Sequence, residues 1–122
     1  MSARILAVDD SPTIRALVSR ALKAAGFEVF LASDGVEGVG ALEDADPHLI
    51  ITDINMPRLD GFGLIESVRA RADYGGVPIL VLTTESGADL KARARAAGAT
   101  GWIVKPFDDA QLISIIDRVL GR

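Results

Sequence analysis

Short apolar runs, rich in β-branched residues, recur along the chain and predict five buried strands. They occupy residues 5–8, 29–31, 49–51, 79–82 and 102–104. Continuous apolar runs of this length are typical of strands that are covered on both faces. We therefore expect each of them to lie inside a sheet rather than at its solvent-exposed side.

Helix-length segments separate these runs. The clearest follows Ser11 and Pro12, ends at Gly26, and carries apolar side chains at the i, i+3, i+4, i+7 and i+8 spacing of an amphipathic helix. Those positions are Ile14, Leu17, Val18, Ala21 and Leu22. Similar spacing predicts a helix over residues 61–71 and another over 112–120, the latter capped by Asp108 or Asp109.

Two further helices have weaker signals. Val36, Val39 and Leu42 keep helical spacing, but glycines at positions 35, 38 and 40 oppose a helix there, since an interior glycine costs about 1 kcal/mol relative to alanine. Residues 90–97 contain many alanines and few large apolar groups, so we expect a thinly anchored and more mobile helix.

Five strands that alternate with five helices predict a doubly wound α/β fold, with a parallel sheet between two layers of helices. In such folds ligands bind beyond the carboxyl ends of the strands, where the winding reverses direction. Residues that follow the predicted strands are therefore the first candidates for a functional site.

Polar side chains stand at four of these strand ends. Asp9 and Asp10 follow the first strand, Asp53 follows the third, Thr83 ends the fourth, and Lys105 follows the fifth. Three neighbouring carboxylates repel one another unless a cation lies among them. An all-oxygen ligand set points to Mg²⁺ or Mn²⁺, and Mg²⁺ leaves coordination positions for phosphate oxygens. Lys105 and Thr83 would then supply charge and a hydrogen bond to a phosphoryl group.

A single aspartate pair, threonine or lysine at a strand end most often only begins a loop. Loop formation gives no reason, however, for carboxylates after the first and third strands together with a lysine after the fifth. The combination therefore favours a functional site over four unrelated loop residues.

Composition narrows the function classes further. With 17 acidic and 13 basic side chains the net charge is −4, and the isoelectric point near 4.9 disfavours duplex nucleic acid as a partner. No cysteine and a single histidine, His48, exclude disulfides, cysteine nucleophiles and zinc clusters. We expect His48 to be a solvated loop residue. No apolar stretch is long enough for a signal peptide or a membrane span, so we expect a cytoplasmic protein that binds neither membrane nor nucleic acid.

Four motifs, taken together, resemble the receiver domain of two-component response regulators, and in particular the CheY-like single-domain receivers of chemotaxis. The motifs are VDDS at 8–11, TDINMPRLDG at 52–61, LTT at 82–84 and KPF at 105–107. The resemblance covers essentially the whole chain, so we expect one receiver domain over residues 1–122. It implies the flavodoxin-like strand order 2-1-3-4-5, for which CheY is itself a standard example.

The resemblance also implies roles for the residues at the strand ends. Asp53 would accept a phosphoryl group from a phosphohistidine. Asp10 and Asp53 would bind Mg²⁺ through their carboxylates, Asn55 through its main-chain carbonyl, and Asp9 mostly through a water. Lys105 would form an ion pair with the phosphoryl group. The chain would then catalyse only its own phosphorylation and dephosphorylation and would not be an enzyme toward other substrates.

Further positions are implied to carry the signal. Thr83 would shift to the phosphoryl group and allow Trp102, three residues before the lysine, to swing inward. The family more often has tyrosine or phenylalanine there, and a smaller residue than Thr84 after the threonine. Asn55 and Glu85 stand at positions that influence hydrolysis of the acyl phosphate, and they match the pair of fast-turnover chemotaxis receivers. A cis peptide bond before Pro106 is also implied.

The resemblance implies that partners bind at the fourth helix, fifth strand and fifth helix. Lys91, Arg93 and Arg95 form a basic cluster in the sequence of the fourth helix, and Lys91 and Arg95 together with Trp102 are the candidate partner surface. The alternative is an ordinary solvated face. The expected partners are a CheA-like histidine kinase and a protein target such as the flagellar motor switch. Since nothing follows Arg122, we expect the output to be a protein contact, made by a monomer.

Other functions stay open at this point. A phosphate sink or a phosphorelay intermediate would use the same site. A Mg²⁺-dependent phosphatase with an aspartyl-phosphate intermediate needs a second aspartate two residues after the nucleophile, where this chain has Asn55. A nucleotide or flavin binder is disfavoured because no phosphate-binding glycine loop occurs, and the chain could also be a receiver excised from a longer regulator.

Overall fold

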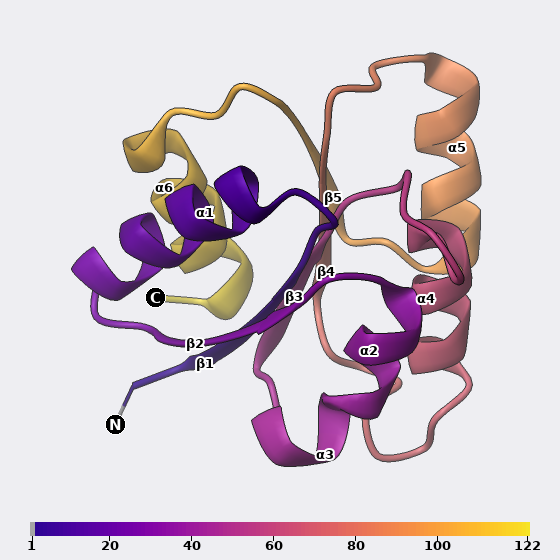
Figure 1. Ribbon diagram of the computed structural model, residues 1–122, viewed down its shortest axis with the longest axis horizontal. Coiled ribbons are helices and arrows are strands. Elements are labelled where there is room, and N and C mark those ends of the chain that lie inside the picture. The colour runs from indigo at the N-terminus through magenta and orange to yellow at the C-terminus, as the bar shows by residue number, and fades with distance from the viewer. Residues whose placement is uncertain (1) are drawn as a thin grey trace.

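The computed structural model describes residues 2–122, and its centre is a parallel sheet of five strands (Figure 1). The strands are β1 (Arg4–Val8), β2 (Glu28–Ala32), β3 (Leu49–Thr52), β4 (Ile79–Thr83) and β5 (Gly101–Val104). Their order in the sheet is β2-β1-β3-β4-β5, and every neighbouring pair is parallel. The predicted strands and the strand order implied by the resemblance are confirmed.

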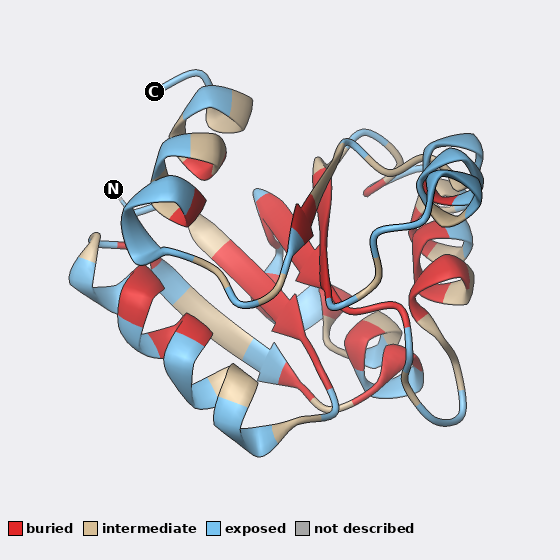
Figure 2. Ribbon diagram, turned by 90° about the horizontal axis from the view of Figure 1, so that it is seen from above, coloured by how far each residue is buried: buried red, intermediate tan, exposed pale blue. Residues whose placement is uncertain are grey.

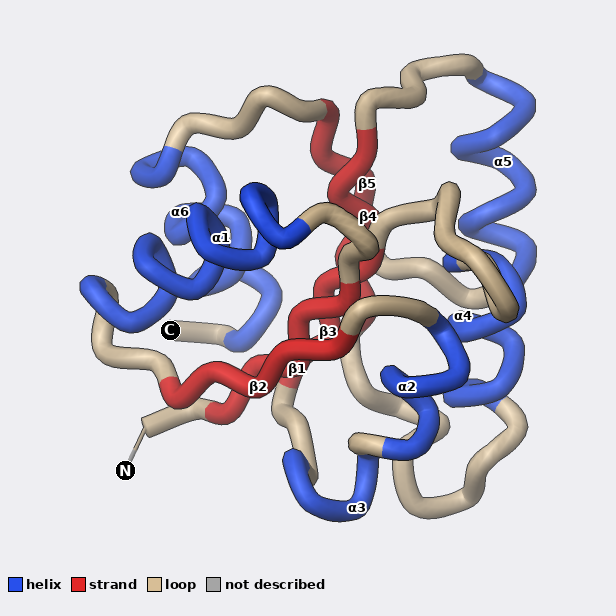
Figure 3. The backbone as a smooth tube through the Cα atoms, viewed as in Figure 1, coloured by secondary structure: helices blue, strands red, loops and turns tan. Residues whose placement is uncertain are grey.

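Helices cover both faces of this sheet. Within residues 2–122 they are α1 (Pro12–Ala24), α2 (Gly35–Gly40), α3 (Leu42–Ala45), α4 (Gly61–Arg69), α5 (Ala88–Ala97) and α6 (Asp109–Leu120). Figures 1 and 3 show α1 and α6 on one face and the other four on the opposite face. The two cores follow from the alternation along β1: Ile5 and Ala7 pack toward α1 and α6, whereas Leu6 and Val8 pack toward the other layer.

The central strands are buried on both sides, as their continuous apolar sequence predicts. All four residues of β3 and all five of β4 are buried, and Figure 2 shows these strands in red between the helices. Edge strand β2 is more exposed. The burial pattern confirms the doubly wound architecture.

The second predicted helix is wrong in its extent, and residues 2–122 form six helices where five were expected. α2 ends at Gly40, and Ala41 is at once the C-cap of α2 and the N-cap of α3. The glycines lower the helix propensity of this segment. Gly38 is retained by packing, because a Cβ there would lie 3.1 Å from Val8 Cγ2.

The ends of the other helices agree with the sequence within two or three residues; α6 begins at Asp109. Asp108, not Asp109, caps α6 by accepting a hydrogen bond from the Ala110 N–H at 3.1 Å. α4 ends at Arg69 rather than at residue 71. In α5, whose ten residues are all described, Ala94 is the one buried side chain, so the thin anchoring is confirmed and its mobility stays a prediction. Among residues 2–122 no helix has the length and apolar character needed to cross a membrane.

Candidate functional site

Three carboxylates converge at the carboxyl end of the sheet. Asp9 and Asp10 follow β1, Asp53 follows the adjacent β3, and one oxygen from each lies within 4.8 Å of the others. The convergence follows from strand register: Val8 is level with Thr52, and the Asp53 N–H donates to the Val8 carbonyl at 3.0 Å. Asp9 and Asp53 are buried, whereas Asp10 is exposed to solvent.

Lys105 lies between two of these carboxylates. Its Nζ is 2.7 Å from Asp9 Oδ2 and 3.0 Å from Asp53 Oδ2, and its side chain is only 9% exposed. Burial disfavours the charged ammonium, but the hydrogen bonds to Asp9 and Asp53 outweigh it, so the pKa of Lys105 is raised. Lys105 therefore carries its positive charge into the cluster. The Lys105–Pro106 peptide bond is cis, as expected.

Main-chain and arginine donors fix the acids in place. The Ser11 N–H donates to Asp9 Oδ1 at 2.9 Å, and the Ile54 N–H donates to Asp53 Oδ1 at 2.6 Å. Arg15, from the first turn of α1, donates to the Asp9 carbonyl at 2.7 Å. These contacts leave Oδ2 of both aspartates toward Lys105. Sequence reasoning missed Arg15, since nothing local shows that a helix arginine reaches back to a strand end.

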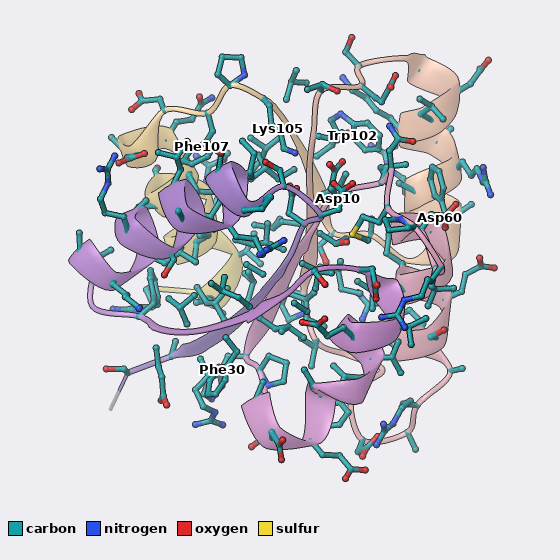
Figure 4. The ribbon with its side chains drawn as sticks, viewed as in Figure 1. Asp10, Phe30, Asp60, Trp102, Lys105 and Phe107 are labelled. Atoms are coloured by element: carbon teal, nitrogen blue, oxygen red, sulfur yellow. The ribbon has the colours of Figure 1, made fainter. Side chains whose placement is uncertain are left out.

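Glu85 is hydrogen-bonded to the three other residues that the resemblance assigns to signalling or hydrolysis: Thr83, Asn55 and Trp102. Thr83 is fully buried at the end of β4, and its hydroxyl accepts from the Glu85 N–H at 3.4 Å. The Glu85 carbonyl accepts from the Trp102 indole N–H at 3.0 Å. Its carboxylate accepts from the Asn55 amide at 3.4 Å. Lys105 and Asp10 lie at the same edge of the sheet (Figure 4), and Thr84 is exposed.

The proposed basic cluster on α5 is only partly one surface. Lys91 and Arg95 line a small groove of about 70 Å³ with Trp102. Arg93 points elsewhere, with its guanidinium carbon 3.9 Å from the centre of the Phe62 ring. Residues at i and i+4 share a helix face, and the residue at i+2 does not. His48 is exposed as expected, and its Nδ1 accepts from the Arg4 N–H at 2.9 Å.

The donor set suits a hard divalent cation. All three side chains are carboxylates, and Mg²⁺ typically takes one or two of these together with water or phosphate oxygens. Asp10 is open to solvent, so a cation can reach the buried pair through it. Without a cation, Lys105 offsets part of the negative charge of Asp9 and Asp53. The acidic cluster can therefore hold a metal ion.

Comparison with known proteins agrees with this geometry. The family model of the response regulator receiver domain matches residues 5–117. Chemotaxis protein CheY1 of Helicobacter pylori is 38% identical over 120 residues, which are 97% of each chain. The transcriptional regulatory protein PrrA of Mycobacterium tuberculosis is also 38% identical, but this chain spans only about half of that protein, 51% of its length.

Solved structures match over the full chain. Chemotaxis protein CheY4 of Vibrio cholerae superposes with a TM-score of 0.93 and 44% identity, covering 98% of this chain and 99% of that one. The receiver domain of the sensor histidine kinase PA1611 of Pseudomonas aeruginosa has a TM-score of 0.91, 30% identity and full coverage of both chains. That structure holds a magnesium ion in its active site cleft.

Proposed function

The chain belongs to the family of response regulator receiver domains, and on this basis we propose that Asp53 accepts a phosphoryl group from the phosphohistidine of a histidine kinase. One observation supports this most directly. The Lys105 ammonium lies within 3.0 Å of Asp53 Oδ2 and bridges it to Asp9. A cation beside a strand-end carboxylate is the arrangement that phosphoryl transfer needs, since charge develops on the phosphoryl oxygens.

The nucleophile is the Asp53 carboxylate. The Ile54 N–H holds Oδ1, so Oδ2 attacks phosphorus while the phosphorus–nitrogen bond to the kinase imidazole breaks and the imidazole leaves. The product is an acyl phosphate on Asp53. Lys105 then transfers its hydrogen bond from the carboxylate to a phosphoryl oxygen, for which it is already in place.

Asp10 and Asp53 would hold Mg²⁺ with the main-chain carbonyl of Asn55, and Asp9 would act mostly through a water. When bound, the ion supplies positive charge beside the phosphoryl oxygens. The protein residues supply the rest: two buried aspartates in fixed orientation and an exposed Asp10 through which the cation enters.

The signal passes from Thr83 to Trp102 through Glu85. If the Thr83 hydroxyl turns to the phosphoryl group, it leaves the Glu85 N–H, and the Glu85 peptide that also bonds the indole is free to move. Asn55 and Glu85, whose side chains are hydrogen-bonded to each other, would influence the rate at which water hydrolyses the acyl phosphate. The phosphorylated state is thus expressed at Trp102, beside α5.

The output is a contact with another protein through α5, β5 and α6, which are the fourth helix, fifth strand and fifth helix expected from the sequence. This surface includes Lys91, Arg95 and Trp102. Similarity to CheY1 and CheY4 over whole chains favours chemotaxis and a motor-switch target, with a CheA-like kinase as donor and the cytoplasm as location. PrrA, of which this chain spans half, shows that receivers also serve transcription. A phosphate sink and a phosphorelay intermediate are the alternatives within this class.

A separate enzyme class would be a phosphatase that turns over many external phosphoesters at Asp53. Asn55 stands where such an enzyme needs an acid, and its amide is held by Glu85. We therefore propose that the chain is not an enzyme toward other substrates. Turnover of several phosphoesters per chain would contradict this.

Intact mass after incubation with acetyl phosphate tests the acceptor. We expect one phosphoryl group per chain in Mg²⁺, none in chelator, and none on Asp53→Asn in either. If natural chain and variant gain the same mass, Asp53 is not the acceptor. If neither gains mass, the fluorescence of Trp102 is recorded with beryllofluoride, a stable mimic of the phosphoryl group. A spectral change that requires both Mg²⁺ and Asp53 supports a short-lived acyl phosphate, and the absence of a change refutes the proposal.

The partner is tested separately. Kinase and motor-switch components are titrated against the protein with and without beryllofluoride. Tighter binding of the switch component in the activated state supports a motor ligand. Equal affinity in both states would refute a phosphorylation-controlled output.

A further inference from the structure

The loop that leaves the acidic cluster, residues 54–60, has an unusual backbone at its centre. Arg58 adopts a φ of +65°, and the Leu59 N–H donates to the Pro57 carbonyl at 2.7 Å, which closes a three-residue turn around Arg58. A non-glycine residue is disfavoured in this region and persists only where surrounding contacts hold it. Contacts from elsewhere in the fold must therefore hold this turn.

Those contacts come from the turn between β2 and α2. Arg58 Nε donates to Asp34 Oδ2 at 2.7 Å, and the Gly35 N–H donates to the Leu59 carbonyl at 3.0 Å. The approach is so close that a Cβ on Gly35 would lie 2.3 Å from the Leu59 oxygen. The Asp34 side chain is 7% exposed, whereas Arg58 is 59% exposed. The loop is therefore fastened by a carboxylate inside the protein.

Asp34 is itself held rigidly. Its Oδ1 accepts from the Glu37 N–H at 2.8 Å and caps α2. The strand just before it is tied to the acidic cluster, because the Asp9 N–H donates to the Ala32 carbonyl at 3.1 Å. One short turn thus bonds the main chain of Asp9 on one side and the loop after Asp53 on the other.

The loop in turn carries a residue of the proposed site. Asn55 is its second residue, and its amide reaches Glu85. At the far end, the Gly61 N–H donates to the Ile54 carbonyl at 2.9 Å, and Asp60 caps α4. Between these two anchored ends, the Arg58 turn determines where the main chain of Asn55 lies relative to the acids.

We propose that Asp34 and Arg58 are positioning residues, whose ion pair holds loop 54–60 so that the Asn55 main chain faces the cation site of Asp10 and Asp53. The inference rests on the proposed function, since it assigns the pair to Mg²⁺ binding. The pair touches neither the phosphoryl group nor the cation. It acts as an outer support that orients a ligand, a kind of residue whose loss typically weakens metal binding roughly tenfold or more.

The test is Mg²⁺ titration of Asp34→Asn, Arg58→Gln and the double variant, followed by the amide NMR shifts of Asn55 and Asp10. Asparagine keeps a cap for α2, so we expect Asp34→Asn to fold. We expect the Mg²⁺ Kd to rise about tenfold in each single variant. The double variant should be no weaker than the singles, since both remove one interaction. Unchanged Kd values, or effects that multiply, would overturn the pairing.

Two controls separate positioning from general stability. Asp73→Asn removes an ion pair of similar length but with a more exposed carboxylate, Arg71 to Asp73 at 2.9 Å, beyond the end of α4 that lies away from the acids, and should leave the Kd unchanged. Arg58→Gly removes the pair but also the backbone strain. It should unfold no more easily than Arg58→Gln and still bind Mg²⁺ weakly; a natural Kd in Arg58→Gly would refute the inference.

Failure of the proposed function gives a different result. If the natural chain shows no Mg²⁺-dependent shifts and no phosphorylation by acetyl phosphate, the site assignment fails and this inference fails with it. If the natural chain binds Mg²⁺ and is phosphorylated while all three variants match it, only the inference fails.

Discussion

Replacement of Lys105 by methionine removes the ammonium that lies between two buried carboxylates. Coulomb's law at an effective dielectric constant of 20 gives attractions of about 6 and about 5.5 kcal/mol for contacts at 2.7 and 3.0 Å. Burying the ammonium costs desolvation free energy, which offsets much of this Coulomb attraction in the natural chain and which methionine does not incur. Breaking a buried pair from one side typically costs about 3–5 kcal/mol, and solvent access through Asp10 favours the lower end.

We therefore expect Lys105→Met to lose about 3 kcal/mol of unfolding free energy in chelator at neutral pH. For a domain of this size that lowers the Tm by roughly 10 °C. Mg²⁺ replaces the missing positive charge, so saturating Mg²⁺ should raise the Tm of the variant more than that of the natural chain. The assays are urea unfolding and thermal scans with and without the ion.

Lys91→Met is the matched control, since Lys91 is exposed and has no ion-pair partner among residues 2–122. It should change stability by less than about 0.5 kcal/mol. Two results would refute the reasoning: Lys105→Met as stable as the natural chain in chelator, or equal stabilisation of both by Mg²⁺. Either would mean that Lys105 does not offset the charge of the acids.

Three further changes test other parts of the site. Gly61→Ala places a Cβ 2.2 Å from the main-chain oxygen of Asp53 and should lower the free energy of unfolding in urea by about 3 kcal/mol. Gly40→Ala is the control: a Cβ there meets no atom within 4 Å, so the free energy of unfolding should rise by about 0.5 kcal/mol. Equal effects of the two substitutions would contradict the close approach at Gly61. Trp102→Phe deprives the Glu85 carbonyl of its donor and should destabilise the fold by about 1 kcal/mol, measured the same way, while no loss would show that the hydrogen bond is dispensable. The hydrogen bond from Arg58 lowers the pKa of Asp34 below its ordinary value of 3.8. The ionised Asp34 carboxylate therefore stabilises the folded state at pH values above 3.8, and this stabilisation is lost as the pH falls through the lowered pKa of the folded state. The difference in urea midpoint between the natural chain and Asp34→Asn should therefore be constant from pH 7 to 5 and shrink below about pH 4; a difference that persists in acid would exclude this ionisation.

Periodicity alone determined most of the fold. Five apolar runs are the five strands, and the stripes of α1, α4 and α6 lie where the spacing puts them, because the apolar face of an element must be buried whatever it packs against. The split of the second helix at Ala41 was not predicted. Its glycines reduce helix propensity, but nothing in the local pattern marks Ala41 as the end of one helix and the start of the next.

The acids of the candidate site were also predictable. Residues that follow parallel strands meet at one edge of the sheet, so Asp9 and Asp53 are neighbours once β1 and β3 are adjacent. Lys105 follows β5, two strands from β3, and its long side chain brings the ammonium between the two carboxylates. The resemblance, not the strand pattern, assigned Asn55 a role in metal binding, and that role stays a prediction.

Only the tertiary structure decided which side chains support that site. Arg15 bonds the Asp9 carbonyl, and Arg58 bonds Asp34 from 24 residues away. Arg93, two residues from Lys91, faces Phe62 instead of the α5 groove. Local sequence specifies how a segment coils and which face is apolar. The reach of one long polar side chain to another element depends on the distance and angle between packed elements, and those are properties of the whole fold.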